Sequence, residues 1–280
     1  MEKEFLSAPL PFVGQKKKFV SHFKKVLKQY PDNAVFVDLF GGSGLLSHIT
    51  KHEKPDATVV YNDFDNFRAR LANVKRTNAL LADLRVLVQN CPRGKRIQGK
   101  AREAIFDRIA KEEETGYVDY ITISASLLFS MNYKLSLEAL RKESLYNRVR
   151  LTDYVCDGYL DGLKITSCDY KELFETYKDI PNVIFLVDPP YLSTEVGTYK
   201  MNWKLLDYLD VLTVLCGSSF VYFTSNKSSI IELCKWMESH PMVGNPFQRA
   251  TKVECITNLN NIAGYTDIML YKEKHYMDVA

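Results

Sequence analysis

The stretch NAVFVDLFGGSGLLSHITKHE, residues 33–53, decides the fold class. Its first eight residues, 33–40, are mostly apolar and predict a short buried strand. The turn GGSG follows, and LLSHITKHE then predicts a helix. A second apolar run, ATVVYND at residues 57–63, predicts another strand directly after that helix. Strand, glycine turn, helix and strand in this order form a βαβ unit, whose strands are parallel.

The same alternation returns in the second half of the chain. The final two predicted strands are joined by LNNIAGY, which leaves no room for a crossover helix, so we expect them to be antiparallel. The protein is therefore expected to be α/β, with a mainly parallel sheet that ends in an antiparallel pair. The later strands are predicted at residues 163–169, 182–188, 218–226, 252–258 and 266–272.

The middle of the chain has little strand pattern and is expected to be a mainly helical insertion. We therefore expect one catalytic domain, formed by residues 1–90 and 163–280, with residues 91–162 inserted as a subdomain.

Composition narrows the functional classes only slightly. The 37 basic residues exceed the 34 acidic ones and give a net charge of +3, a weak preference for polyanions. The six cysteines are scattered without a C-x-x-C pair, which disfavours a zinc ribbon or a disulfide framework and is typical of a reducing cytoplasm. We expect no metal site, no signal peptide and no membrane-spanning segment, because no apolar run is long enough to cross a bilayer.

The glycine turn has the chemistry of a nucleoside site. Gly42 and Gly44 would let a ligand lie close to the backbone, and Asp38 before them suits a cationic ligand. Asp63 ends the second predicted strand, where a carboxylate can accept the hydroxyls of a ribose. Ser47 stands where a dinucleotide fingerprint would have its third glycine, which disfavours a nicotinamide dehydrogenase. The plainer alternative is an ordinary α/β turn, since glycines and acids are common at strand ends.

The strand VIFLV, residues 183–187, runs directly into Asp-Pro-Pro-Tyr. The Asp188 carboxylate and the Pro189 carbonyl would form two acceptors able to grip both N–H bonds of an amino group. Tyr191 could then stack on the ring that carries this amine. The alternative is a simple strand stop, because two prolines block further pairing.

The order of these motifs resembles that of a known family. P-F-x-G-x-K at residues 11–16 precedes D-x-F-x-G-x-G at 38–44, a strand-end acid, an insertion and D-P-P-Y at 188–191. From about residue 11 to about residue 272 the chain resembles the Dam-type (class alpha) DNA N6-adenine methyltransferases. The resemblance implies a Rossmann-like class I methyltransferase fold. It also implies site-specific methyl transfer from S-adenosyl-L-methionine to the N6 amino group of an adenine flipped out of double-stranded DNA.

The resemblance also assigns roles to residues. The family's cofactor-binding positions correspond here to Phe12, Lys16, Asp38, Phe40, Gly42, Gly44, Asp63, Asp169 and Asp188. Its catalytic positions correspond to Asp188, Pro189, Pro190 and Tyr191. Helix capping is the alternative for Asp169. Leu39 and Gln15 depart from the family's usual Pro and Gly, and the insertion does not match well enough to suggest a target sequence.

The insertion is where such enzymes recognise DNA, and two basic clusters there are the predicted phosphate contacts. The predicted DNA-binding residues are Arg93, Lys95, Arg96, Lys100, Arg102, Arg141 and Lys142, and Arg148 and Arg150 also belong to the second cluster. A solvated helix face is an equally plain explanation for any one of them. Asn132, Tyr133 and Asn147 are base-reading candidates only in a loose sense.

Other functions remain open from the sequence. The same fold could methylate cytosine N4 or RNA, or the chain could be a nucleic-acid-binding relative without activity. We expect a cytoplasmic monomer encoded by a bacterium or a phage. A separate restriction endonuclease, as in restriction-modification, is left open as a partner.

Overall fold

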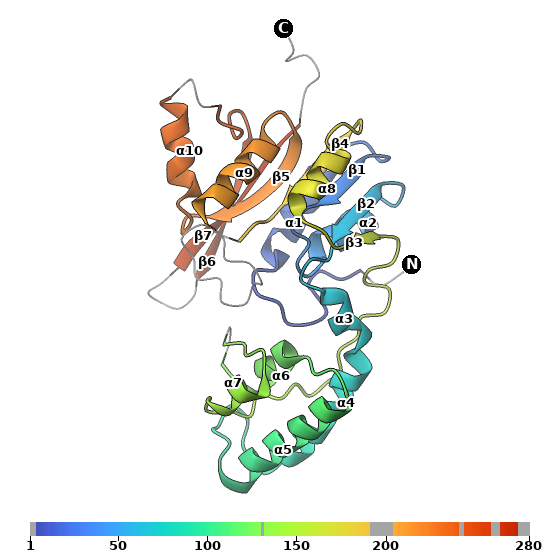
Figure 1. Ribbon diagram of the computed structural model, residues 1–280, viewed down its shortest axis with the longest axis vertical. Helices are drawn as coiled ribbons and strands as arrows, with labels where there is room; N and C mark the ends of the chain where they lie inside the picture. The colour runs from blue at the N-terminus through green and yellow to red at the C-terminus, as the bar shows by residue number, and fades with distance from the viewer. Residues whose placement is uncertain (1–3, 130–131, 191–203, 241–243, 259–263, 274–280) are drawn as a thin grey trace. The chain divides into compact units, whose positions relative to one another are not determined.

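The computed structural model describes residues 4–129, 132–190, 204–240, 244–258 and 264–273 (Figure 1). The chain forms two compact units. The first contains Met1–Ser7, Lys16–Asp65 and Leu160–Ala280, and the second contains Ala8–Gln15 and Asn66–Tyr159.

The first unit is built on a seven-stranded sheet of order β3-β2-β1-β4-β5-β7-β6. Strands β1 to β5 are parallel, whereas β7 is antiparallel to both β5 and β6. The strands are β1 Val35–Asp38, β2 Thr58–Asn62, β3 Lys164–Thr166, β4 Val183–Val187, β5 Ser219–Ser225, β6 Thr251–Asn258 and β7 Gly264–Lys272. The predicted Rossmann-like class I methyltransferase fold, with its antiparallel final pair, is confirmed.

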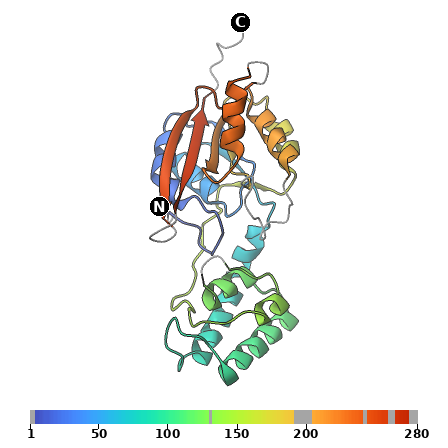
Figure 2. The ribbon, with the colours of Figure 1, turned by 90° about the vertical axis from the view of Figure 1, so that its left-hand side faces the viewer.

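Helices cover both faces of this sheet (Figures 1 and 2). One face packs against α1 Val20–Leu27, with the short helix η1 Lys17–Phe19 before it, and α2 Leu45–Glu53. The other packs against α8 Tyr170–Tyr177, α9 Leu205–Leu215 and α10 Ile230–Glu238. Every residue of β4 is buried, because its alternating side chains enter the two cores in turn. No helix in the described part of the chain is both long enough and apolar enough to span a membrane.

The strand register gathers the polar strand ends at one edge of the sheet. Asp38, the last residue of β1, lies between Tyr61 on β2 and Leu186 on β4. Asn62, at the end of β2, is paired with Thr166 on β3. The carboxyl ends of parallel strands are where open α/β sheets bind ligands. This edge therefore holds the candidate site.

The second unit is mainly helical, as predicted for the insertion, but it begins earlier than residue 91. Its helices are α3 Phe67–Ala72, α4 Val74–Leu87, α5 Gly99–Thr115, α6 Tyr120–Leu127 and α7 Leu137–Arg141. Residues 66–90 were expected with the catalytic domain. They fold with the second unit because apolar side chains of α4, such as Leu80 and Leu84, share a core with Ile105 and Ile109 of α5.

Candidate active site at the ends of the parallel strands

Asp38 is a buried carboxylate with one oxygen unused. Its Oδ2 atom accepts a hydrogen bond from Ser47 Oγ at 2.7 Å. Its Oδ1 atom is buried and has no hydrogen-bond partner among the described residues. The pKa of Asp38 is raised to about 7, mainly by burial and also by the nearby Asp188 carboxylate, although the Ser47 hydroxyl acts to lower it. A buried carboxylate is stabilised by a cation, so this oxygen suits a positively charged ligand.

The glycine turn beside Asp38 has the predicted geometry. Gly42 and Gly44 have φ angles of 50° and 72°, in the left-handed region that favours glycine. The Gly44 N–H donates to Gly41 O at 2.7 Å, which closes the turn just before α2. The turn thus connects the end of β1, where Asp38 lies, to the start of α2.

Tyr61 connects this turn to Asp63. The ring is fully buried, and its hydroxyl lies 2.8 Å from Gly42 O and 3.0 Å from Asp63 Oδ1. Asp63, predicted to bind a ribose, is itself buried, and its N–H donates to Thr166 O at 2.7 Å. The predicted ribose acid is therefore fixed both through its backbone and through the Tyr61 hydroxyl.

Asn62 ties together the loops that follow β1 and β3. Its Nδ2 atom donates to Leu39 O and to Cys168 O, each at 3.0 Å. Its Oδ1 atom accepts from the Cys168 N–H at 3.1 Å. Neither Tyr61 nor Asn62 was predicted as a site residue. The sequence shows only that Asn62 is a polar residue at the end of an apolar run. The structure is needed to show which loops its side chain joins.

We expect Asn62→Ala to weaken binding of S-adenosyl-L-methionine by at least about tenfold and to lower the free energy of unfolding by about 3 kcal/mol. Each buried polar group left unpaired costs about 1–3 kcal/mol. The change would leave three such groups without their hydrogen-bond partner, in the two loops that Asn62 joins. Calorimetric titration and chemical denaturation measure the two quantities.

Asn78 provides the matched control for this change. It makes the same kind of amide bridge, to the Tyr154 carbonyl and N–H at 2.9 Å each, but it lies in the second unit. Asn78→Ala should lower stability and leave cofactor affinity unchanged. Unchanged affinity in Asn62→Ala as well would disprove its positioning role.

Phe40 and Asp169 lie on the β1 and β3 loops. The Phe40 ring packs against Tyr170 of α8, with ring centroids 4.8 Å apart. The Asp169 side chain accepts from the Lys171 N–H at 2.8 Å and so caps α8. Helix capping, the alternative weighed from the sequence, is thus present, and cofactor contact by Asp169 stays a prediction.

Asp188 and Lys16 form an ion pair that the sequence did not predict. Lys16 Nζ lies 2.6 Å from Asp188 Oδ2, and the side chains are 8% and 19% exposed. Burial raises the pKa of Asp188, whereas the Lys16 ammonium lowers it. Pro189 is buried directly after Asp188, and Pro190 is half-buried. Tyr191, the predicted stacking residue, lies outside the described residues.

We expect Lys16→Met to move the acid limb of the pH–rate profile to higher pH at saturating S-adenosyl-L-methionine. An acceptor carboxylate works when ionised, so activity is lost as the pH falls through its pKa. Without Lys16, the pKa of Asp188 rises, so this loss occurs at higher pH. Below the shifted pKa the rate should fall about tenfold per pH unit.

Two lysine variants serve as controls for this pH profile. Lys16→Arg keeps the positive charge, and Lys17→Met removes a charge from the exposed neighbouring position. Both should retain the wild-type limb. An unshifted limb in Lys16→Met would contradict an electrostatic role for the ion pair.

Phe12 belongs to the second unit, whereas Asp38 belongs to the first. Its ring packs edge-on against Phe67, with centroids 5.7 Å apart. The adjacent Pro11 carbonyl accepts from Arg70 Nη2 at 2.8 Å. Contact between Phe12 and a cofactor stays a prediction.

The side chains of the predicted DNA-binding residues differ in the contacts that they make within the protein. Arg93 donates to Val149 O at 2.7 Å, and Lys142 pairs with Glu138 at 2.7 Å. Arg102 and Arg141 lie over the Phe106 ring, at 4.5 and 4.9 Å from its centroid. The side chains of the remaining three are exposed, with no hydrogen bond or ion pair among the described residues: Lys95, Arg96 and Lys100.

The base-reading candidates also differ. Asn147 is buried and donates to Cys91 O, so its amide serves the fold of the second unit. Asn132 is exposed and donates to Glu143 Oε2 at 3.1 Å. Tyr133 is half-buried, and burial raises its pKa. Asn147 is therefore unsuited to reading a base.

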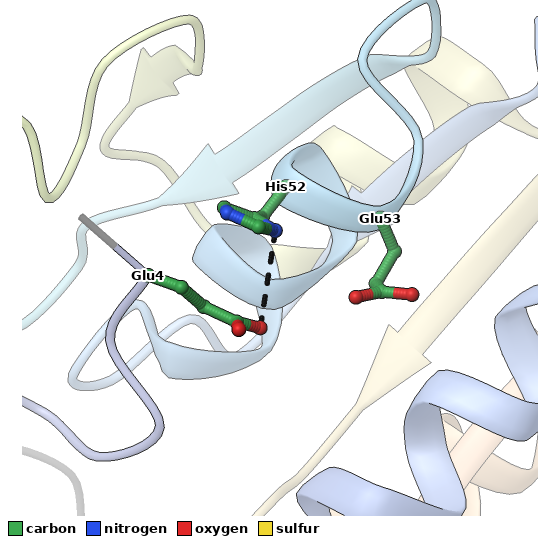
Figure 3. A group of neighbouring side chains, drawn as sticks. All are labelled: Glu4, His52 and Glu53. Atoms are coloured by element: carbon green, nitrogen blue, oxygen red, sulfur yellow. Dashed lines mark ion pairs between the residues drawn. The ribbon is translucent and has the colours of Figure 1, made fainter. Parts of the chain in front are cut away.

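A group of potential metal ligands, Glu4, His52 and Glu53, lies on the first unit (Figure 3). His52 Nδ1 is 3.8 Å from Glu4 Oε1. Lys24 pairs with Glu4 and, at 2.9 Å, with Glu53. Its hydrogen bond lowers the pKa of Glu4. The two carboxylates therefore already share a cation supplied by the chain.

Comparison with known proteins gives likenesses of three kinds. A model of the D12 class N6 adenine-specific DNA methyltransferases matches residues 12–209. A protein of Haemophilus influenzae, whose name describes it provisionally as a methyltransferase, is 36% identical over 97% of this chain and 94% of its own length. The solved structure of precorrin-6y C5,15-methyltransferase from Geobacter metallireducens covers 97% of this chain and 100% of its own, with 10% identity and a TM-score of 0.35. That overlap is too loose to bear on the fold.

Proposed function

Because the chain belongs to the D12 class N6 adenine-specific DNA methyltransferase family, we propose that it transfers a methyl group from S-adenosyl-L-methionine to the N6 amino group of adenine in DNA. The general activity, methyl transfer, follows from the family. The single observation that carries the finer proposal is the position of Asp188. This strand-end carboxylate, followed by Pro189, lies electrostatically coupled to the buried Asp38 of the adjacent strand.

The residues at this edge fit the proposed cofactor. S-adenosyl-L-methionine supplies the methyl group and carries a sulfonium, an amino group and a ribose. The unpartnered Oδ1 atom of Asp38 suits one of its cationic groups. Gly42 is half-buried and has no Cβ atom to keep a ligand from its backbone, and Asp63 can accept ribose hydroxyls.

Asp188 and Pro189 would hold the amine that receives the methyl group. The carboxylate and the carbonyl can each accept one N–H bond of the amino group, which orients the nitrogen lone pair. Lys16 is paired with the Asp188 carboxylate in this structure, so the substrate amine must share the carboxylate with Lys16 or replace Lys16 there. No protein nucleophile is needed, and the contribution of these residues is positioning and electrostatic.

An adenine inside a duplex cannot reach such a pocket, so we infer that the target base is flipped out. The second unit, with its exposed cations, is the proposed DNA-binding and target-recognition subdomain. Phosphate contacts would supply most of the binding energy, as is general for DNA-binding proteins.

Mass spectrometry of nucleosides from DNA and RNA treated with the protein and S-adenosyl-L-methionine tests this function. N6-methyladenine in DNA is the expected product. N4-methylcytosine without N6-methyladenine, or product in RNA alone, would replace the proposal with the corresponding alternative.

A further inference from the structure

Residues 145–150, LYNRVR, form a segment with two different faces in the second unit, and it bends at Asn147, where the Arg148 N–H donates to Tyr146 O at 2.8 Å. Leu145, Asn147 and Val149 are buried, whereas the residues between them point outward. The buried side chains thus alternate with outer ones along the segment. The segment thus presents Tyr146 and Arg148 on a common outer face.

Two other segments lie beside this one. The Ile97 N–H donates to Leu145 O at 2.8 Å, and the Asn147 N–H donates to Lys95 O at 2.9 Å. This pairing places Arg96 directly opposite Tyr146. On the other side, the Tyr146 N–H donates to Leu127 O at 2.8 Å, which brings the end of α6 alongside.

The outer face carries an exposed aromatic ring between cations. Phe129, two residues after α6, is 51% exposed. Its ring centroid lies 4.4 Å from that of Tyr146, and the Arg148 guanidinium lies 5.3 Å from it. Arg96 completes the group. We call these four residues, Arg96, Phe129, Tyr146 and Arg148, the aromatic–arginine face.

No described carboxylate pairs with either arginine of this face. The nearby Glu143 is already paired with Lys134, at 2.6 Å. Arg102 and Lys142 differ, because each already pairs with a carboxylate, Glu103 at 3.0 Å and Glu138 at 2.7 Å. An exposed ring beside unneutralised guanidinium groups matches a nucleic acid, which offers π-faces and phosphates together.

We propose that the aromatic–arginine face is a DNA-contact surface of the second unit, an inference that rests on the proposed function. Arg96 and Arg148 neutralise phosphates of the duplex. Phe129 lies against a base, and Tyr146 supports its ring from behind. Arg96 and Arg148 come from the two basic clusters predicted from the sequence, whereas Phe129 was not predicted to contact DNA.

Salt dependence of binding tests the two arginines. Fluorescence anisotropy with a labelled duplex of mixed sequence gives the affinity over a series of salt concentrations. Arg96→Gln and Arg148→Gln should each reduce the slope of log affinity against log salt by about 0.9, the value for one phosphate contact. Lys111→Gln, an exposed charge on α5, should leave the slope unchanged. Wild-type slopes in both arginine variants would overturn the proposal.

Phe129→Ala tests the ring. We expect about a tenfold loss in kcat/KM for genomic DNA with an unchanged salt slope and an unchanged KM for S-adenosyl-L-methionine, since stacking involves no counterion release. Leu151→Ala, which truncates another exposed apolar side chain of the unit, is the control. If wild-type protein methylates DNA and Phe129→Ala matches it, the proposed contact is wrong while the function stands. If wild-type protein methylates no DNA, the proposed function fails first.

Discussion

Asp188→Ala should lower methyl transfer to DNA by about a hundred- to a thousandfold, since removing one preorganised group that acts on the reacting atoms commonly costs 10²- to 10³-fold. The change removes the carboxylate acceptor and also leaves the Lys16 ammonium, which is 8% exposed, without its partner. Transfer of a labelled methyl group to genomic DNA measures the effect. DNA affinity should stay close to wild type, because the proposed DNA contacts lie in the second unit.

Two further variants separate chemistry from folding. Asp188→Asn keeps the size of the side chain but loses one acceptor, and it should be nearly as inactive. Asp210→Ala removes a more exposed carboxylate that pairs with Lys171 on the same unit, and it should retain activity. Transfer by Asp188→Ala at more than a tenth of the wild-type rate would refute the role assigned to the Asp-Pro-Pro turn.

Gly41→Ala should disrupt cofactor binding through the core. A Cβ atom at Gly41 would lie 2.3 and 2.4 Å from ring carbons of Tyr61 and 2.8 Å from Asn62 O. Tyr61 is fully buried and its hydroxyl contacts Asp63, so the ring cannot yield without moving the predicted ribose acid. We expect a loss of at least about 2 kcal/mol in the free energy of unfolding, typical of overpacking, and at least a tenfold loss of affinity for S-adenosyl-L-methionine.

Gly244→Ala is the matched control, because a Cβ atom there meets nothing within 4 Å. Tyr61→Phe is a milder change that tests the role of Tyr61 if Gly41→Ala does not fold. It removes only the hydroxyl, and it should weaken cofactor binding by about fivefold, the value of one ordinary hydrogen bond. Wild-type cofactor affinity in both Gly41→Ala and Tyr61→Phe would show that Tyr61 does not position Asp63.

The local sequence pattern was sufficient to predict the strands and helices that bury apolar side chains. The strand from Val35 to Asp38 and the helix from Leu45 to Glu53 follow from apolar periodicity and the glycines between them. The start of the second unit at Asn66 did not follow. The apolar face of α4 could pack against either unit, so its sequence pattern does not identify α5 as its partner. The structure shows that α4 and α5 share a core.

The basic residues also show what a local sequence pattern cannot predict about function. Arg93 and Arg96 are equivalent in a charge count, yet one guanidinium is held by the carbonyl of Val149, 56 residues later, and the other is not. Phe129 had no sequence feature that marked it as exposed. Exposure and pairing depend on residues distant in the chain, so a local pattern cannot rank such candidates.

The sequence by itself determined the fold class, the motif order and the residue types at the strand ends, because these depend on short-range periodicity and on chemistry carried by single side chains. The tertiary structure alone decided that Lys16 pairs with Asp188, that Asn62 joins two loops and that Asp38 keeps one oxygen unpaired. Each of these depends on how the fold arranges segments that are distant in the chain. Hydrogen bonds and ion pairs require a particular distance and direction, and only the folded chain defines both.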